Sequence, residues 1–181
     1  MKTLKQFNEA YADEYLDNNI RLIIIDKLKN ALKEELNAWY GYLIIKDFLV
    51  GPYRAEITKL YEETAKDELK DHGYWLMKRI NELGGTIEDI SISPASWLTA
   101  THTYASPKWS QKDNSNDLIV NTIESLYTNI ENEKGAIESY KEIIEIAKKG
   151  KDYTTESKCK QILADEEEHL QLLQDFIDDI I

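Results

Sequence analysis

The sequence predicts an all-α fold, a bundle of four long helices with one long crossover between the second and third. Only seven glycines and three prolines interrupt the 181 residues, a composition in which helix formers dominate. Four long segments repeat apolar residues at helical spacing and stop at turns that contain glycine. Between the second and third segments, residues 86–116 are rich in Ser, Thr and Pro and are too long for an ordinary turn.

The N-terminal half is expected to contain three helices. A short amphipathic helix is predicted over residues 3–18, within an N-terminal extension of residues 1–20. Its apolar side consists of Leu4, Phe7, Tyr11 and Tyr15. The first long helix is predicted over residues 22–50 and ends at Gly51 and Pro52, and the second over residues 53–83 ends at Gly84 and Gly85.

The C-terminal half is expected to form a second helical hairpin. The third long helix is predicted from Asp117, as a possible N-cap, to Gly150, and the fourth from Asp152 to the end of the chain. The crossover must span the length of the bundle, which keeps the second and third helices parallel. We therefore expect residues 1–181 to form a single domain.

Charge and cysteine content restrict the function. The formal net charge is −12 at pH 7, which argues against nucleic acid as the main ligand because phosphate binding needs clustered Lys and Arg. The single cysteine, Cys159, excludes an internal disulfide and fits a reducing compartment. The apolar run of residues 20–25 is too short for a membrane span. Together with the absence of a signal peptide, this predicts a cytoplasmic protein without a membrane partner.

Acidic side chains fall on the apolar faces of the third and fourth helices. At 100° per residue, Glu166 and His169 lie within the apolar stripe of the fourth helix, whereas Glu167 and Glu168 lie on its polar side. Glu133 is the one charge in the continuous apolar series of the third helix. A buried carboxylate without a partner costs several kcal/mol, so these acids need partners.

The first hairpin repeats this pattern. Glu35 lies on the core face of the first helix, and Glu68 and His72 lie along the edge of the stripe of the second. Glu68 follows Glu35 by 33 positions, and Glu166 follows Glu133 by the same 33. In each pair, the two glutamates also lie almost the same number of residues from the turn that joins their helices. The sequence therefore predicts an internal two-fold repeat that brings carboxylates to one height in both hairpins.

Such a cluster suits two divalent cations. Four inward carboxylates and two neutral imidazoles would be neutralised by two such ions, and without them the like charges would take up protons. Oxygen and nitrogen ligands without thiolate favour iron or manganese, with zinc as an alternative. Either Glu68 and Glu166 or Glu35 and Glu133 would bridge the two ions. Paired ferrous ions held in this way can pass two electrons to O₂ or peroxide.

Four motifs resemble those of the ferritin-like superfamily, nearest to the bacterioferritins and the Dps-like ferritins. They are EELNAWYGY (34–42), DELKDH (67–72), ENEKGAIESY (131–140) and ILADEEEH (162–169). The resemblance covers roughly residues 26–181. It implies a di-iron ferroxidase centre, with two iron ions per subunit, in a hollow homo-oligomeric shell that stores the oxidised iron. The catalytic and metal-binding residues would be Glu35, Glu68, His72, Glu133, Glu166 and His169.

The sequence departs from the family pattern at two places. The family usually has Glu-x-x-His in the second helix, whereas Glu68 stands four residues before His72, so Asp71 is an alternative ligand. Some Dps-like ferritins have a cysteine pair near the site, but Cys159 stands alone and is interpreted as a small core residue.

Several aromatic residues are interpreted mainly as packing residues. Tyr42 and Tyr140 each follow an inward glutamate by seven positions, so a hydrogen bond to a ligand or a redox role is the alternative for both. The crossover side chains expected to pack on the bundle or on a neighbouring subunit are Trp97, His102, Tyr104 and Trp109.

The favoured function is a ferroxidase that oxidises Fe(II) with O₂ or H₂O₂ and stores or detoxifies iron. We expect no fifth helix, which favours a shell of 12 subunits over one of 24. A rubrerythrin-like peroxidase or a manganese catalase-like enzyme is an alternative on the same fold, although one cysteine cannot build the second iron site of rubrerythrins. A DNA-protecting shell would need basic tails, and a metal-free structural bundle would show no iron uptake.

Overall fold

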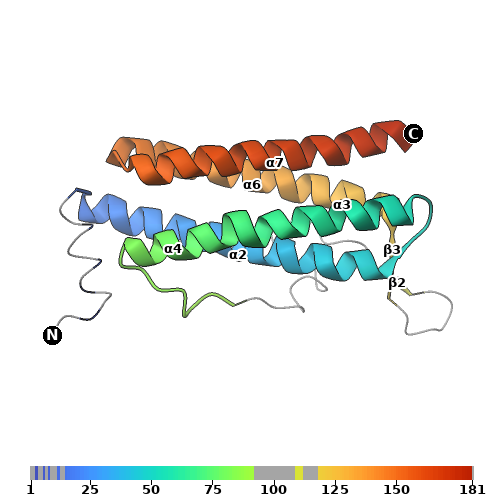
Figure 1. Ribbon diagram of the computed structural model, residues 1–181, viewed down its shortest axis with the longest axis horizontal. Helices are drawn as coiled ribbons and strands as arrows, with labels where there is room; N and C mark the ends of the chain where they lie inside the picture. Colours follow the sequence, from blue (N-terminus) through green and yellow to red (C-terminus); the bar gives the residue numbers. More distant parts are fainter. Residues whose placement is uncertain are drawn as a thin grey trace.

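The computed structural model describes residues 15–91, 109–111 and 118–180, together with the single positions 3, 6, 8 and 12. Long helices dominate it and lie side by side (Figure 1), so the predicted all-α bundle is confirmed. None of the helices in these residues is both long enough and apolar enough to cross a membrane.

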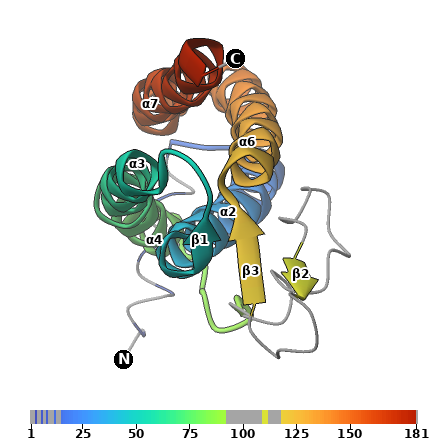
Figure 2. The same cartoon turned by 90° about the vertical axis from the view of Figure 1, so that its right-hand side faces the viewer.

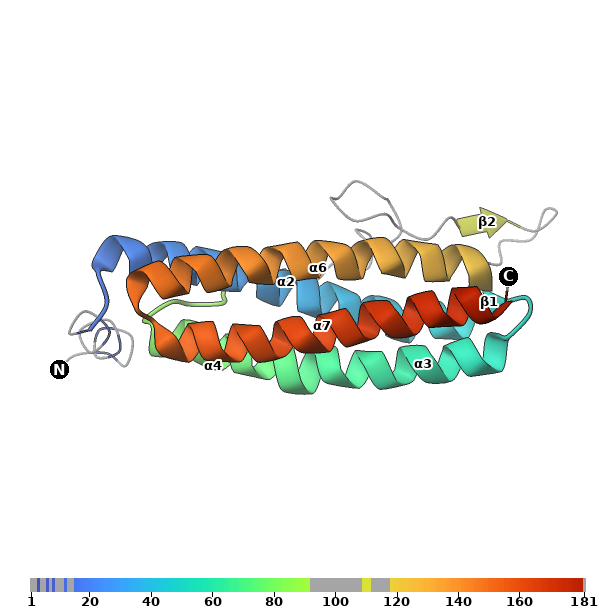
Figure 3. The same ribbon diagram turned by 90° about the horizontal axis from the view of Figure 1, so that it is seen from above.

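The bundle consists of two helical hairpins. The first contains α2 (Asn18–Phe48) and a returning helix in three parts: α3 (Arg54–Asp67), the π-helix η1 (Glu68–Gly73) and α4 (Tyr74–Glu82). The second contains α6 (Thr122–Gly150) and α7 (Tyr153–Ile180). Figures 1 and 3 show that α6 runs parallel to α3 and α4, as a crossover between the hairpins requires.

A small sheet lies at the end of the bundle where α2 turns into α3 (Figure 2). It contains β1 (Leu49–Val50), β2 (Trp109–Gln111) and β3 (Leu118–Asn121) in the order β1-β3-β2. Leu49 pairs with Val120 in the parallel direction, and Trp109 pairs with the same residue in the antiparallel direction. The sheet therefore joins the end of α2 to the start of α6.

This sheet corrects two predicted helix boundaries. The first long helix ends at Phe48 instead of position 50, and the third begins at Thr122 instead of position 117. The β-branched residues Ile119 and Val120 favour an extended backbone, which forms ladder hydrogen bonds with both neighbouring strands. Asp117, the expected N-cap, lies outside the described residues.

The first long helix also begins earlier than predicted, at Asn18, so residues 18–20 belong to α2 and not to an N-terminal extension. Asp17 is its N-cap, since its carboxylate accepts hydrogen bonds from the backbone N–H groups of Asn19 at 3.0 Å and Ile20 at 3.2 Å. Most of the helix predicted over residues 3–18 lies outside the described residues. Trp97, His102 and Tyr104 lie outside them as well. Trp109 is described only as part of β2.

The apolar core is divided into two clusters along the bundle. One lies towards the α6–α7 turn and includes Leu28, Leu32, Leu76, Ile80 and Ile162. The other lies towards the sheet and includes Tyr42, Ile45, Ile57, Tyr61 and Leu173. The acidic positions predicted to face inward lie between these two sets along the helices.

A buried ion pair secures the α6–α7 turn. Arg79 of α4 donates to Asp152 at 2.7 Å and to the hydroxyl of Thr155 at 2.9 Å. Asp152 also accepts from the Thr155 backbone N–H at 3.1 Å, which caps α7. The pair ties the end of the first hairpin to the turn of the second and thereby fixes how the hairpins pack.

Candidate metal centre

Six side chains from both hairpins converge at the middle of the bundle, each with an exposed fraction between 0% and 6%. They are Glu35 of α2, Glu68 and His72 of η1, Glu133 of α6, and Glu166 and His169 of α7. These are the same six side chains that the sequence analysis gave as candidate metal ligands. The structure therefore brings together carboxylates and imidazoles that are far apart in the chain.

The cluster divides into two sets that are able to hold a metal ion. The first consists of Glu35, Glu68, His72 and Glu166, and the second of Glu68, Glu133, Glu166 and His169. Within each set, one potential ligand atom per residue lies within 4.8 Å of the others. Glu68 and Glu166 belong to both sets, whereas each histidine and each of the remaining glutamates belongs to one.

The position of Glu68 and His72 differs from the prediction that they lie along the edge of the apolar stripe. Both are buried, with exposed fractions of 1% and 0%. They occupy the π-helical segment η1, in which a turn takes more residues than in an α-helix, so a spacing of four places both side chains inward. Asp71 is exposed and belongs to neither set, which argues against it as a replacement ligand.

Each histidine faces the carboxylates through its Nδ1 atom. His72 Nδ1 lies 3.3 Å from Glu35, 3.2 Å from Glu68 and 3.1 Å from Glu166. His169 Nδ1 lies 3.4 Å from Glu68 and 3.5 Å from Glu166. The two imidazole rings have their centroids 6.1 Å apart, and both rings lie within 3.5 Å of Glu166 and Glu68.

The outer nitrogen of each imidazole faces an aspartate that sequence analysis missed. His72 Nε2 lies 3.3 Å from Asp165, and His169 Nε2 lies 3.6 Å from Asp67. Each aspartate directly precedes an inward glutamate of the other hairpin, and this symmetric placement was the available signal. A carboxylate at this nitrogen orients a ligating imidazole and raises its basicity.

Two tyrosines also contact the glutamates across the bundle. The hydroxyl of Tyr42 donates to Glu133 Oε1, and the hydroxyl of Tyr140 donates to Glu35 Oε1. Burial, and next the carboxylates beside them, raise the pKa of both tyrosines well above the usual value, so both keep their protons. Both tyrosines pack in the core, as mainly expected, and the alternative of a hydrogen bond to a candidate ligand is confirmed as well.

Burial and the proximity of several carboxylates make the cluster hold protons. Burial, and next the negative charges of Glu166 and Glu68, raise the pKa of Glu35 and of Glu133. Burial alone would raise the pKa of Glu68, but Glu35, His169 and His72 lower it. Burial would lower the pKa of His169, yet the adjacent carboxylates of Glu166 and Glu68 raise it to about 11.

Polar atoms without a good hydrogen bond within the cluster fit a metal site. Glu68 Oε1, Glu166 Oε1 and His169 Nδ1 are buried and, among the described residues, take part in close ion-pair contacts but in no hydrogen bond of good geometry. Such atoms cost free energy in a protein interior unless another group or an ion satisfies them. All three are potential ligands in the sets described above. Oxygen and imidazole donors of this kind suit iron or manganese, and zinc as an alternative.

Cys159 lies outside both sets and is fully buried in the cluster towards the α6–α7 turn. Burial, together with the negative charge of Asp152, raises the pKa of its thiol to about 12. This environment keeps the thiol protonated and unreactive, in agreement with its interpretation as a small core residue.

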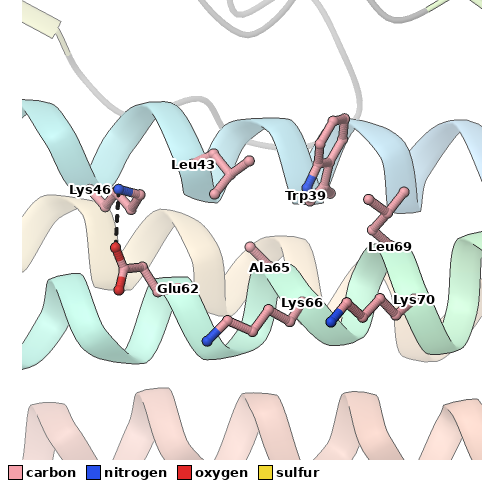
Figure 4. A pocket seen from close by; sticks show the side chains of 8 residues that line it. All are labelled: Trp39, Leu43, Lys46, Glu62, Ala65, Lys66, Leu69 and Lys70. Atoms are coloured by element: carbon pink, nitrogen blue, oxygen red, sulfur yellow. Dashed lines mark ion pairs between the residues drawn. The ribbon is translucent and has the colours of Figure 1, made fainter.

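A groove of about 450 Å³ lies between α2 and α3 and contains none of the six candidate ligands (Figure 4). Trp39 and Leu69 line it with apolar side chains, and Lys66 and Lys70 extend along one side. Lys46, which also lines it, pairs with Glu62 at 3.2 Å. The groove is thus a surface feature that is separate from the metal centre.

Comparison with known proteins gives consistent results. The family model of the ferritin-like domain matches residues 25–181. The dodecameric thioferritin from Bacteroides fragilis, a bacterioferritin-related protein, is 34% identical to this chain, with 93% of this chain and 90% of that chain covered and a TM-score of 0.73. No curated protein matches the chain.

Two further structures share the fold at lower identity. A ferritin-like, diiron-carboxylate protein from Bacillus anthracis str. Ames is 21% identical, with coverages of 88% and 99% and a TM-score of 0.68. Dps from Thermosynechococcus elongatus is 18% identical, with coverages of 88% and 92% and a TM-score of 0.69. The match over residues 25–181, the bundle topology and the similarity to the thioferritin lead to one conclusion: the chain belongs to the ferritin-like family.

Proposed function

We propose that this protein is a ferroxidase, which binds two Fe(II) ions per chain at the candidate metal centre and oxidises them with O₂ or H₂O₂. The observation that supports this most directly is the pair of ligand sets that share Glu68 and Glu166. Residues common to both sets are suited to bridge two ions, whereas Glu35 with His72 and Glu133 with His169 complete one set each. Of the two bridging pairs that the sequence left open, this geometry favours Glu68 and Glu166.

The reaction follows from the number of ions. Two Fe(II) ions give up one electron each, and these two electrons with two protons reduce O₂ to H₂O₂ or, with H₂O₂ as oxidant, yield two water molecules. The residues of the chain hold the substrate ions close together and exclude bulk water. Tyr42 and Tyr140 orient the outer glutamates through the hydrogen bonds described above.

We further propose that copies of the chain assemble into a hollow shell that receives the oxidised iron. The dodecameric state of the thioferritin at 34% identity supports a shell of twelve. The net charge of −12 would favour entry of cations and disfavour binding of DNA. Native mass spectrometry tests the assembly, and a monomer or dimer at cellular concentration would exclude a storage shell.

The proposed activity can be tested with a matched pair of variants. Glu133→Ala removes an inward carboxylate and should abolish rapid Fe(II) oxidation while the helical circular dichroism is retained. Glu131→Ala removes an exposed carboxylate of the same helix, paired only with Lys134 at 2.7 Å among the described contacts, and should oxidise Fe(II) at the wild-type rate. Equal oxidation rates for the two variants would refute the role of this centre.

The same assay distinguishes the alternative enzymes. A manganese catalase-like protein would release O₂ from H₂O₂ without consuming Fe(II), and a rubrerythrin-like peroxidase would need an external reductant. Under the proposed function, Fe(II) is consumed and ferric product remains with the protein. Retention of ferric iron in the particle after gel filtration is therefore the expected result.

A further inference from the structure

The helix that returns from α2 contains one irregular turn, at the height of the metal centre. It is α-helical in α3 and α4 but π-helical over Glu68–Gly73, and the backbone N–H of Tyr74 bonds to the carbonyl of Leu69, five residues back. The equivalent helix of the second hairpin, α7, is α-helical throughout. The two hairpins therefore differ at the position where they are expected to be most alike.

The ligand spacing differs in the same way. Glu166 and His169 of α7 are three residues apart, whereas Glu68 and His72 are four apart. Nevertheless each histidine belongs to one ligand set together with Glu68 and Glu166. The first hairpin therefore contains one additional residue between its glutamate and its histidine, and the structure compensates for it.

A continuous α-helix would not compensate for an additional residue. Each residue rotates the helix by about 100°, so all the side chains after the additional one would turn away from the core by that angle. Instead, Ile57 and Tyr61 before the π-turn and Leu76 and Ile80 after it are all fully buried. The π-turn absorbs one residue and keeps both parts of the helix in register.

Gly73 is the residue at which this wide turn closes against α2. A Cβ atom at this position would lie 3.1 Å from the carbonyl oxygen of Glu68 and 3.9 Å from side-chain atoms of Leu32 and Leu36. Its backbone is ordinary and helical, with φ −58° and ψ −44°, so space, and not backbone strain, is what favours glycine here. The two leucine contacts are ordinary van der Waals distances, but the carbonyl of Glu68 would have to shift by a few tenths of an ångström to make room for a methyl group.

We propose that Gly73 is a positioning residue of the metal centre. Because glycine leaves room for the Glu68 carbonyl, the π-turn can absorb the additional residue. The π-turn then brings Glu68 and His72 into one ligand set. A corollary is that the additional residue is dispensable once the turn is α-helical. This inference rests on the metal binding proposed above and concerns how one half of that site is built.

The experiment uses four variants of the full-length chain. Gly73→Ala introduces the methyl group, and deletion of Asp71 removes one exposed residue and restores a three-residue spacing between Glu68 and His72. The third variant combines both changes, since an α-helical turn has no need of glycine. Lys70→Ala changes an exposed side chain of the same turn and serves as the control.

Each purified variant is titrated with Co(II) without oxygen, and the visible absorption of the bound ion reports its ligands. Wild-type protein and Lys70→Ala should bind two ions per chain. Gly73→Ala should bind both ions more weakly, because Glu68 belongs to both ligand sets. The ion held by Glu35 and His72 should be bound at least about tenfold more weakly, with an altered spectrum, as is typical when the support of a ligand is removed. Deletion of Asp71 alone should leave the affinity for both ions and the spectrum as in the wild type, and deletion combined with Gly73→Ala should restore both.

The outcomes separate this inference from the proposed function. Absence of Co(II) and Fe(II) binding by the wild-type chain would refute the proposed function and this inference with it. Normal binding by wild-type protein together with unchanged binding by Gly73→Ala would overturn the positioning role alone. Failure of the combined variant to bind better than Gly73→Ala, with helical content retained, would also overturn it.

Discussion

Tyr42 of α2 donates a hydrogen bond to Glu133 of α6, and Tyr140 of α6 donates in return to Glu35 of α2. Each tyrosine follows a candidate ligand by seven positions and supports the candidate ligand of the other helix. The two helices are thus joined by a reciprocal pair of contacts, and each contact belongs to a different ligand set. Removal of either hydroxyl should therefore affect one set more than the other.

This relationship predicts that Tyr42→Phe and Tyr140→Phe have different effects. Tyr42→Phe should weaken the ion held by Glu133 and His169, and Tyr140→Phe the ion held by Glu35 and His72, each on the order of tenfold. Stepwise titration with Co(II) measures both affinities. The identity of the weakened ion follows from comparison with His169→Ala and His72→Ala, and a uniform loss at both ions would contradict the reciprocal arrangement.

The aspartates at the outer nitrogens should tune the histidines. Asp165→Ala removes the partner of His72 Nε2, and Asp67→Ala that of His169 Nε2. Loss of such a partner typically lowers metal affinity by about 10–100-fold. Glu167→Ala, at an exposed position of α7, is the control in the same titration and should bind like the wild-type chain. Affinities that do not distinguish Asp165→Ala from Glu167→Ala would show that the contact has no role.

The metal-free protein should become less stable as pH rises. The pKa values of Glu35, Glu133, His72 and His169 are all raised in the folded chain, so it holds protons that the unfolded chain releases. This stabilisation is complete below the unfolded pKa values, about 4.3 for Glu and about 6.5 for His, and is lost as pH rises through the folded values. The lowered pKa of Glu68 acts in the opposite direction, but only in acid.

Bound cations should replace these protons, so metal affinity should increase with pH. The difference in Tm between Co(II)-loaded and metal-free protein should accordingly widen from about pH 6 to about pH 9. Thermal unfolding followed by circular dichroism measures it. A difference that stays constant over this range would mean that the cluster does not hold the expected protons.

The ion pair at the α6–α7 turn should be important for stability. Arg79→Met leaves Asp152, 2% exposed, without its cationic partner, and breaking a buried pair in this way typically costs about 3–5 kcal/mol. Lys141→Ala breaks an exposed pair with Glu138 and should have little effect on the free energy of unfolding. Urea unfolding of metal-free protein compares the two, and similar free energies of unfolding would contradict the assigned role of Arg79.

Much of the candidate metal centre could be predicted because most of its helices are regular. Glu35, Glu133, Glu166 and His169 lie on uninterrupted α-helices, in which an angle of 100° per residue identifies the buried face. The same angle placed Glu68 and His72 at an edge, because a π-turn leaves no distinctive mark in a single sequence. The spacing of 33 residues nevertheless placed Glu68 at the height of the other inward glutamates, since it depends on distance from the turn and not on helical angle.

The strands were not predictable for a different reason. Residues 118–121 form too short an apolar run to distinguish a strand from the start of a helix. These residues form a strand because they pair with Leu49 and Val50, which are remote in the sequence. The partners of Tyr42 and Tyr140 depend in the same way on how the hairpins pack, so local spacing favoured simple packing and left the hydrogen bond only as an alternative.

The division of the core into two clusters has a consequence for how the bundle opens. Most helical bundles fray from their ends, but here the apolar clusters secure both ends and a layer of buried ionisable groups lies between them. In the metal-free protein, the midsections of the helices are the least protected part, and amide hydrogens there should exchange with solvent before those at either flank. Cation binding would reverse the order of exchange and make the middle of the bundle its most rigid part.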